Sequence, residues 1–514
     1  MTGRIARNSA WSASGYLGGA LVLLLATPLY VHYLGAERFG LFSLLVAVTA
    51  PLGILNAGLA QATTKYVAQF SRCGMWRSAA RMIETTLAFN LAWGLCGAAL
   101  LWFGAPWIGT AVFHIRPDML TEAAWAFRLS GINWLLTQVL GTYQAAITGL
   151  QDFKRLTLVQ LVQQALAYGV GSLVIVFVPR IWGALLPQVV ISALLIGFWF
   201  GQVRKHIPQV RCAPRWHHDS ARLSIGFSAW QVVNSITATA SEQADRLTLG
   251  SMVDTAAVGY YSVGATVQAR LVGLVWSMFA AVFPAVSSLS GAAGESERLI
   301  LDYGWKVSVF AGCLYATLFV LGPDFLQMWL GHDVGGHAAP ILRVLAGVAL
   351  AGLPSAILAQ YLLGHGLTKW STLSNVFTSA LSVTLTVVFV KQSGIRGAAW
   401  GALLALLLTR PLFHLWVFGR RFRDSVPVAR CFWGLYSILV SASVGCGIGV
   451  GAYRMLGAVL PAFPAFVASA VVVPFIVLAV TTLIEASLMG HRQQVEDLWS
   501  DLGRGVALVA AKMN

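Results

Sequence analysis

One apolar stretch of the chain carries polar side chains at helical spacing. Within residues 256–285, Ser262, Thr266, Arg270, Gly273 and Ser277 follow steps of 4, 4, 3 and 4, so they share one helix face. An arginine at the centre of a membrane helix costs about 2.5–3.5 kcal/mol on insertion scales. A wet cavity with an anionic ligand offsets that cost, because a guanidinium grips phosphate oxygens in bidentate fashion. Arg270 is therefore the leading candidate for binding an anion, and a structural pair with a carboxylate is the alternative.

Similar stripes lie in other apolar stretches, although a single Ser or Thr in a membrane helix more often joins two helices than binds a ligand. The candidate substrate-binding residues that accompany Arg270 are Tyr16, Asn133, Gln144, Asn234, Ser241, Ser262 and Thr266. Glu242 and Arg246 stand four residues apart, which favours an intrahelical ion pair. Asp245 and Glu242 are the candidates for binding a coupling cation.

The elements that position these residues are membrane helices. The chain is 57% hydrophobic and 10% charged, with a mean hydropathy of +0.73, whereas soluble domains are about 25% charged. About 20 apolar residues span a bilayer. Fourteen such stretches lie near residues 10–34, 39–62, 82–104, 123–149, 156–178, 181–203, 223–248, 256–285, 303–323, 339–363, 371–390, 396–418, 429–453 and 462–488.

The chain also repeats its own pattern about 215 residues downstream. Gly149–Thr157 (GLQDFKRLT) is echoed by Gly364–Thr372 (GHGLTKWST). Phe39-Gly-Leu-Phe-Ser43 is echoed by Val258-Gly-Tyr-Tyr-Ser262, and Ile181-Trp-Gly-Ala184 by Ile395-Arg-Gly-Ala398. Two homologous membrane halves commonly enclose a transport site at the bilayer midplane.

These patterns predict an all-α polytopic membrane protein of about fourteen transmembrane helices. It has two pseudo-symmetric six-helix lobes and two extra C-terminal helices. The predicted parts are residues 1–210, 211–425, 426–490 and an amphipathic tail at 491–514. With the N-terminus inside, most of the 34 Lys and Arg residues fall in inside segments, so both termini are predicted to be cytoplasmic.

Several kinds of chemistry are disfavoured by the sequence. The basic residues are scattered over short loops, so the net charge of +15 indicates topology rather than nucleic-acid binding. No Walker A, GxGxxG or CxxC motif occurs. The six cysteines lie in spans or inside segments, so no disulfide is expected. His217-His218 could belong to a metal site, but a solvated basic loop is the better interpretation. No cofactor, metal or catalytic residue is predicted.

The opening residues 8–68 resemble the start of bacterial polysaccharide transporters, the O-antigen flippases of the multidrug/oligosaccharidyl-lipid/polysaccharide (MOP) exporter superfamily. The resemblance rests on Leu34-Gly35-x-x-x-Phe39-Gly40, on Asn56-Ala-Gly58-Leu59, and on Asp245-Arg246 followed by Val258-Gly-Tyr-Tyr261. Gly322-Pro323 with Trp329-Leu-Gly331 fits as well. The resemblance covers the whole chain.

The resemblance implies a multi-pass protein of the bacterial cytoplasmic membrane that is not an enzyme. Its substrate would be an oligosaccharide on undecaprenyl diphosphate, moved from the inner to the outer leaflet by alternating access for surface polysaccharide synthesis. Membrane lipids are expected partners, and polysaccharide polymerase machinery is a candidate partner. A cation-coupled exporter of small amphipathic compounds and a polytopic glycan-assembly enzyme are the alternatives. The enzyme is disfavoured because no long outside loop is predicted.

Overall fold

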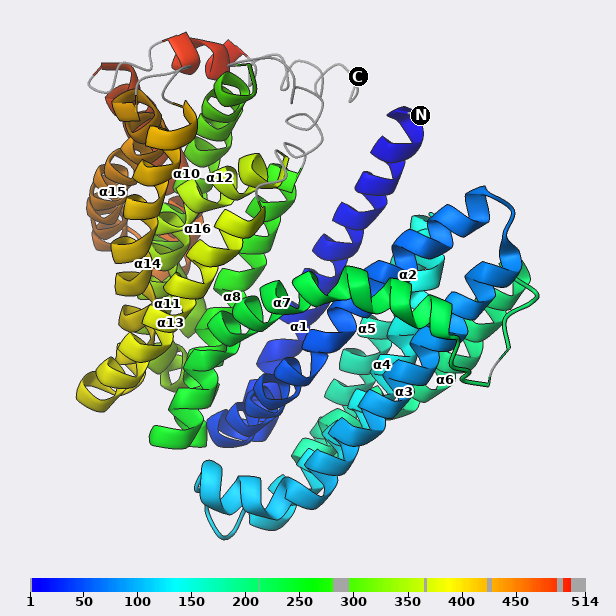
Figure 1. Cartoon of the computed structure of the whole chain (residues 1–514). Helices are drawn as coiled ribbons and strands as arrows, with labels where there is room; N and C mark the ends of the chain where they lie inside the picture. Colours follow the sequence, from blue (N-terminus) through cyan, green and yellow to red (C-terminus); the bar gives the residue numbers. More distant parts are fainter. Residues whose placement is uncertain are drawn as a thin grey trace, which may run out of the picture. The chain divides into compact units, whose positions relative to one another are not determined.

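The computed structural model describes residues 2–211, 213–280, 295–364, 368–422, 428–487 and 493–500. Every regular element in this part of the chain is a helix (Figure 1), which confirms the predicted all-α class. The helices are α1 (Thr2–Thr49), η1 (Ala50–Gly53), α2 (Ile54–Arg72), α3 (Trp76–Trp107), η2 (Ile108–Val112), α4 (Leu120–Gly149), α5 (Phe153–Phe177), α6 (Ile181–His206), α7 (His218–Met252), α8 (Thr255–Ala280), α10 (Glu295–Leu330), α11 (His332–Ala351), α12 (Leu353–Gly364), α13 (Thr368–Ser393), α14 (Ile395–Val417), η3 (Phe418–Phe422), α15 (Val428–Val459) and α16 (Ala462–Ser487).

Ten segments of the described chain are long and apolar enough to cross a membrane. They include α1, α3, α5, α6, α10 and α13–α16, and one of them joins α11 to most of α12. The protein is therefore an integral membrane protein. The helix α4 is 30 residues long but is not among the ten, because Asn133, Gln138 and Gln144 lower its hydropathy. The predicted count of fourteen spans stays a prediction.

Contacts divide the chain into two compact units. The first, unit 1, consists of residues 1–263 and 390–395, and the second, unit 2, consists of residues 264–389 and 396–514. In unit 1, α4 packs against α3 and α6, α5 packs against α1 and α6, and α7 packs against α2. In unit 2, α10 packs against α11, α15 and α16. The lobe boundaries predicted from the sequence stay predictions.

The first two predicted spans are joined at Gly35. This residue has φ 74° and ψ 168°, and it interrupts α1 with a kink. L-residues with a side chain rarely adopt positive φ, so glycine is the residue that suits this break. The predicted second span is itself interrupted by the short helix η1, which contains Pro51.

Gly40 of α1 and Gly259 of α8 bring two backbones into direct contact within unit 1. A Cβ atom at Gly40 would lie 1.6 Å from the carbonyl oxygen of Thr255, and one at Gly259 would lie 2.3 Å from that of Ala36. Each carbonyl belongs to the residue four positions before the opposite glycine, so the contact is reciprocal. The two glycines hold the same place in the echoed segments Phe39–Ser43 and Val258–Ser262.

The other echoes also fall on matching structural positions. Ile181 begins α6 and Ile395 begins α14. Lys154 and Lys369 are each the second residue of a helix, α5 and α13 respectively. The repeated sequence therefore starts equivalent helices in the two halves of the chain.

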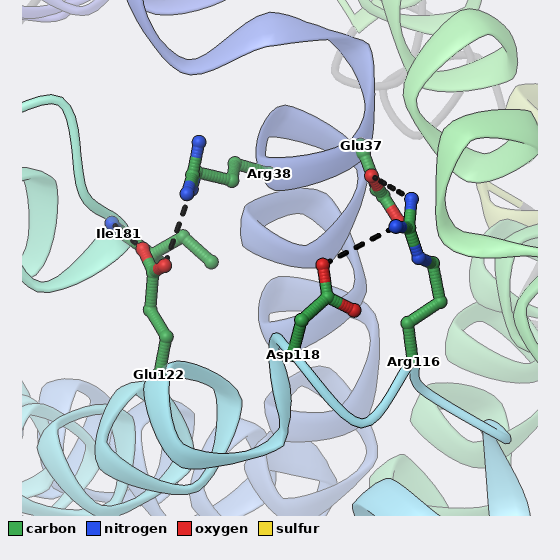
Figure 2. A network of polar contacts seen from close by, with 6 residues as sticks. All are labelled: Glu37, Arg38, Arg116, Asp118, Glu122 and Ile181. Atoms are coloured by element: carbon green, nitrogen blue, oxygen red, sulfur yellow. Dashed lines mark hydrogen bonds and ion pairs between the residues drawn. The ribbon is translucent and has the colours of Figure 1, made fainter.

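Glu122 at the start of α4 links its own helix to α1 and α6 at one end of unit 1. One carboxylate oxygen accepts from Arg38 Nε at 3.1 Å, and the other accepts from the backbone N–H of Ile181 at 2.7 Å (Figure 2). Arg116 lies beside them and pairs with Glu37 at 3.4 Å and Asp118 at 3.3 Å (Figure 2). The network fixes the chain after the kink of α1 relative to the start of α4 and α6.

A second carboxylate, Glu84 of α3, holds the segment between α6 and α7. It is 5% exposed and accepts from the backbone N–H of Arg211 and from His217 Nε2, each at 3.1 Å. The backbone N–H of His217 also donates to Thr85 Oγ1 at 3.3 Å. His217 therefore joins a loop to a helix through a carboxylate 133 residues earlier in the sequence.

In unit 2, the buried carboxylate of Glu485 joins α16 to α10 and α15. It accepts hydrogen bonds from Trp305 Nε1 at 3.0 Å, Ser437 Oγ at 2.9 Å and Ser441 Oγ at 2.8 Å. Residues 493–500 of the predicted amphipathic tail are helical. Val495, which is 8% exposed, and Leu498 pack in one apolar cluster with Trp305 of α10 and Ile438 of α15. Part of the apolar face of the tail thus contacts protein.

We expect Gly40→Ala to lower the thermal stability of the purified protein, because the added methyl group overlaps a backbone oxygen. Overpacking of this kind costs about 1–3 kcal/mol. The matched control is Gly197→Ala in α6, where a Cβ meets nothing within 4 Å. Melting of both variants in detergent, followed by size-exclusion chromatography, measures the difference. Equal melting temperatures would contradict the close contact.

Candidate functional site

The stripe predicted on α8 contains residues in different environments. Ser262 is 2% exposed, while Thr266 and Arg270 are half-buried. The side chain of Ser277 lies outside the described residues. Arg270 keeps its position near the middle of α8 (Thr255–Ala280), and its role in binding an anion stays a prediction.

A polar cluster joins the end of α7 to the start of α8. Asp245, 8% exposed, accepts a short hydrogen bond from the Tyr261 hydroxyl. Arg246 donates from Nε to Ser262 Oγ at 3.1 Å and from Nη1 to Gln243 Oε1 at 3.0 Å. The structure thus brings together Asp245 and Ser262, two predicted site residues, within unit 1. A buried carboxylate beside a phenol can take up a proton or a small cation.

The other candidate for cation coupling, Glu242, is exposed. Arg246 donates hydrogen bonds to Gln243 and Ser262, and its charge also acts on the Glu242 carboxylate. The ion pair predicted between Glu242 and Arg246 stays a prediction. Asp245 is thus the buried member of the two candidate carboxylates, and a role of either one in binding a cation stays a prediction.

Unit 1 also contains a pocket of about 470 Å³, a volume that includes space open to solvent. Its walls come from α1, α4, α5 and α6. The lining residues are Phe42, Leu45, Val46, Thr49, Ser130, Asn133, Trp134, Thr137, Tyr168, Leu185 and Gln188. None of them is charged. The pocket combines aromatic rings with amide and hydroxyl groups, which is the usual composition of a site for a small polar molecule.

Glycines of α3 allow the pocket wall to form. A Cβ at Gly97 would lie 2.5 Å from Trp134 Nε1, and a Cβ at Gly94 would lie 2.7 Å from the Leu135 side chain. A Cβ at Gly131 of α4 would lie 3.1 Å from the carbonyl oxygen of Ala98. The helices α3 and α4 therefore pack closely, and the indole of Trp134 has space beside the pocket.

Asn133 is the predicted substrate-binding residue that the structure places in this pocket. Its Oδ1 accepts from Ser192 Oγ of α6 at 3.2 Å, which orients the amide. Gln144 lies further along α4 and outside the pocket lining. Its Oε1 accepts a hydrogen bond from Gln160 Nε2 of α5 at 3.4 Å. Tyr16 is half-buried in α1. The side chains of Asn234 and Ser241 lie outside the described residues.

Two pocket residues, Tyr168 and Gln188, were not singled out by the sequence. Tyr168 follows Gln160 and Gln164 at steps of four on α5, a polar row that forms no part of the predicted stripes. The local signals at Gln188 are Pro187 before it and Ser192 four residues after it, in the first half of α6. The guanidinium of Arg128 in α4 lies over the rings of Trp102 and Trp125, at 5.6 and 5.0 Å from their centroids.

The described residues contain no group of three or more His, Cys, Asp or Glu side chains that could hold a metal ion. His217, which the sequence placed in a solvated loop or a metal site, is half-buried and bound to Glu84.

A family profile described as polysaccharide biosynthesis protein matches residues 5–290. The chain belongs to this family. A Shigella flexneri protein named "Putative O-antigen transporter" is 23% identical over 429 residues, which cover 81% of this chain and 98% of that protein. The predicted membership of a polysaccharide transporter family is confirmed.

Solved structures show the same fold at low sequence identity. The lipid II flippase MurJ, in an inward closed conformation, matches with a TM-score of 0.71 and 12% identity over 93% of this chain and 99% of its own. An inward-facing multidrug resistance MATE family transporter of the MOP superfamily matches with a TM-score of 0.67 and 15% identity over 80% of this chain and 98% of its own. The chain therefore has the MATE/MurJ-like polytopic fold, and its family and neighbours are transporters rather than enzymes.

We expect Tyr261→Phe to destabilise the protein, because the variant removes a hydroxyl that donates to the buried carboxylate of Asp245. Loss of one partner of a buried hydrogen bond to a charged group costs about 1–3 kcal/mol. Tyr33→Phe is the control, since Tyr33 is 37% exposed. Thermal melting of the two variants is the measurement. A Tyr261→Phe variant as stable as the control would show that this hydrogen bond contributes nothing.

Proposed function

We propose that this protein moves an oligosaccharide linked to undecaprenyl diphosphate from the inner to the outer leaflet of the bacterial cytoplasmic membrane. The observation that carries the proposal is the match of residues 5–290 to the polysaccharide biosynthesis family. The likeness to a protein named as an O-antigen transporter, along nearly its whole length, supports it. The fold shared with a lipid II flippase is in keeping with a lipid-linked substrate.

In the proposed mechanism, the polar head of the substrate enters a water-filled interior while the lipid tail stays in the bilayer. Arg270 neutralises the diphosphate, since a guanidinium offers several N–H donors to phosphate oxygens. Thr266, Ser262, Asn234, Ser241, Asn133, Gln144 and Tyr16 are the proposed hydrogen-bonding partners of the sugars. Membrane lipids surround the tail, and a polysaccharide polymerase is the proposed recipient of the product.

Alternating access requires a contact that closes one side and separates when that side opens. The backbone contact between Gly40 and Gly259 has the right properties, because it joins equivalent positions of the two repeats and contains no side chain that must rearrange. In the orientation with cytoplasmic termini, this contact lies toward the outer side, just after the first outside turn. We propose that it closes the outer side until the substrate is released there.

A second candidate function, export of small amphipathic compounds coupled to a cation, is favoured by one observation. The fold matches a multidrug resistance MATE transporter with a TM-score of 0.67. The two functions differ in the phenotype of a deletion strain. Loss of surface polysaccharide indicates the flippase, and altered drug susceptibility without a glycan defect indicates the exporter.

Arg270→Gln is expected to abolish most surface polysaccharide and to leave lipid-linked oligosaccharide inside the cell. Charge-assisted hydrogen bonds contribute about 1.5–3 kcal/mol each, so transport should fall about tenfold or more. Quantification of surface glycan and of the lipid-linked precursor in complemented deletion strains measures both effects. Arg343→Gln is the control, because Arg343 is exposed in α11 and is expected to extend to the membrane surface. Normal surface glycan with Arg270→Gln would contradict the assigned role.

Asp245→Asn is expected to remove any stimulation of transport by an ion gradient, because a neutral amide cannot exchange a proton or balance a cation. Glu242→Gln should keep the stimulation, since Glu242 is exposed. Transport into vesicles with an imposed proton or sodium gradient, compared with vesicles lacking one, provides the measurement. Stimulation that survives in Asp245→Asn, or that is lost only in Glu242→Gln, would rule out Asp245 as the coupling residue.

A further inference from the structure

The uncharged pocket of unit 1 has a hydrogen-bonding group that the protein does not use. Gln188 lines the pocket, and its Nε2 is buried and has no hydrogen-bond partner in the described structure. An amide left without a partner in a buried site costs about 1–3 kcal/mol, so a polar occupant that accepts from Gln188 would recover that energy.

The hydroxyl groups of the pocket offer acceptors as well. Thr137 Oγ1 donates to the carbonyl oxygen of Trp134 at 2.8 Å, and Thr49 Oγ1 donates to that of Leu45 at 2.9 Å. Each hydroxyl donates its hydrogen to a backbone carbonyl of its own helix. Its oxygen therefore remains available to accept a hydrogen bond from a ligand. Asn133 accepts from Ser192 through Oδ1, which leaves its amide nitrogen as a donor.

The absence of charged residues from the pocket lining favours an uncharged occupant. None of the eleven lining residues is ionisable to a charged form near neutral pH. A diphosphate or a cation would therefore lose its hydration without gaining a counter-charge, and unpaired buried charges are strongly disfavoured. A neutral molecule rich in hydroxyl groups has neither problem, because each hydroxyl can both donate and accept.

The aromatic lining of the pocket favours the same class of occupant. The rings of Phe42, Trp134 and Tyr168 supply flat apolar surface beside the polar groups. A pyranose ring presents C–H groups on its faces and hydroxyl groups around its rim, so it can meet both kinds of surface at once.

We propose that this pocket is a subsite for one neutral sugar ring of the transported glycan, with Gln188 and Asn133 as the residues that select hydroxyl-bearing ligands. The inference rests on the proposed function, since the sugar is a part of the lipid-linked substrate. It separates the recognition of the glycan in unit 1 from the binding of the diphosphate, which is assigned to Arg270.

The test uses the full-length protein in lipid nanodiscs and saturation-transfer NMR with free methyl glycosides. The probes are the neutral glycosides of glucose, galactose, mannose, rhamnose and N-acetylglucosamine, together with glucuronic acid and glucosamine as charged comparisons. The variants Gln188→Leu and Asn133→Leu remove the amides, and an apolar residue of similar size is well tolerated in a membrane helix. Gln163→Leu in α5 is the matched control, because Gln163 does not line the pocket.

We expect saturable binding of at least one neutral glycoside by the unmodified protein and by Gln163→Leu. Binding should weaken about tenfold in each of the two pocket variants, which corresponds to about 1.4 kcal/mol. No saturable binding of a neutral glycoside, preference for the charged sugars, or unchanged binding in either pocket variant would overturn the subsite. Failure of the unmodified protein to flip any lipid-linked oligosaccharide would instead overturn the proposed function, so the two failures are distinguishable.

Discussion

The backbone contact between Gly40 and Gly259 is the constraint on which the arrangement of unit 1 depends. A Cβ on either residue would overlap a carbonyl oxygen of the other helix, so α1 and α8 can approach this closely only through glycine. The contact fixes the half of α1 that follows the kink at Gly35, and this half contributes Phe42, Leu45, Val46 and Thr49 to the pocket. It also fixes the start of α8, where Tyr261 and Ser262 meet Asp245 and Arg246. The pocket and the polar cluster around Asp245 thus both depend on one contact between equivalent positions of the two repeats.

The acidic residues described above have two kinds of role. Some hold distant segments together, and others are candidates for function. Glu122, Glu84 and Glu485 each accept two or three hydrogen bonds from different helices or loops. Such contacts join segments that are distant in sequence, and they return part of the cost of burying a carboxylate. Asp245 differs because its partners lie at the junction of α7 and α8, beside the contact between the two repeats. In the mechanism proposed above, this position would link the state of Asp245 to the contact between Gly40 and Gly259.

The sequence predicted the class of fold and the repeat because both leave periodic signals. Long apolar stretches predicted membrane helices, and the echoes of Gly40 in Gly259 and of Ile181 in Ile395 fall on equivalent positions. The stripe on α4 led to Asn133, which lines the pocket. The contribution of Gln188 was not predicted, since Gln188 and Ser192 form only a two-residue pair on an otherwise apolar stretch of α6. The contact between Glu84 and His217 was not predicted either. The two residues are 133 positions apart, and no local pattern links them.

The central proposal is that this chain carries a lipid-linked glycan across a bilayer. The most direct measurement reconstitutes the purified protein in vesicles that contain undecaprenyl diphosphate oligosaccharide, and follows the fraction of glycan open to a glycosidase added outside. If the protein is a flippase, this fraction is expected to rise relative to protein-free vesicles, at a rate that grows with the amount of protein. A fraction that stays at the level of protein-free vesicles, with correctly folded protein present, would contradict it.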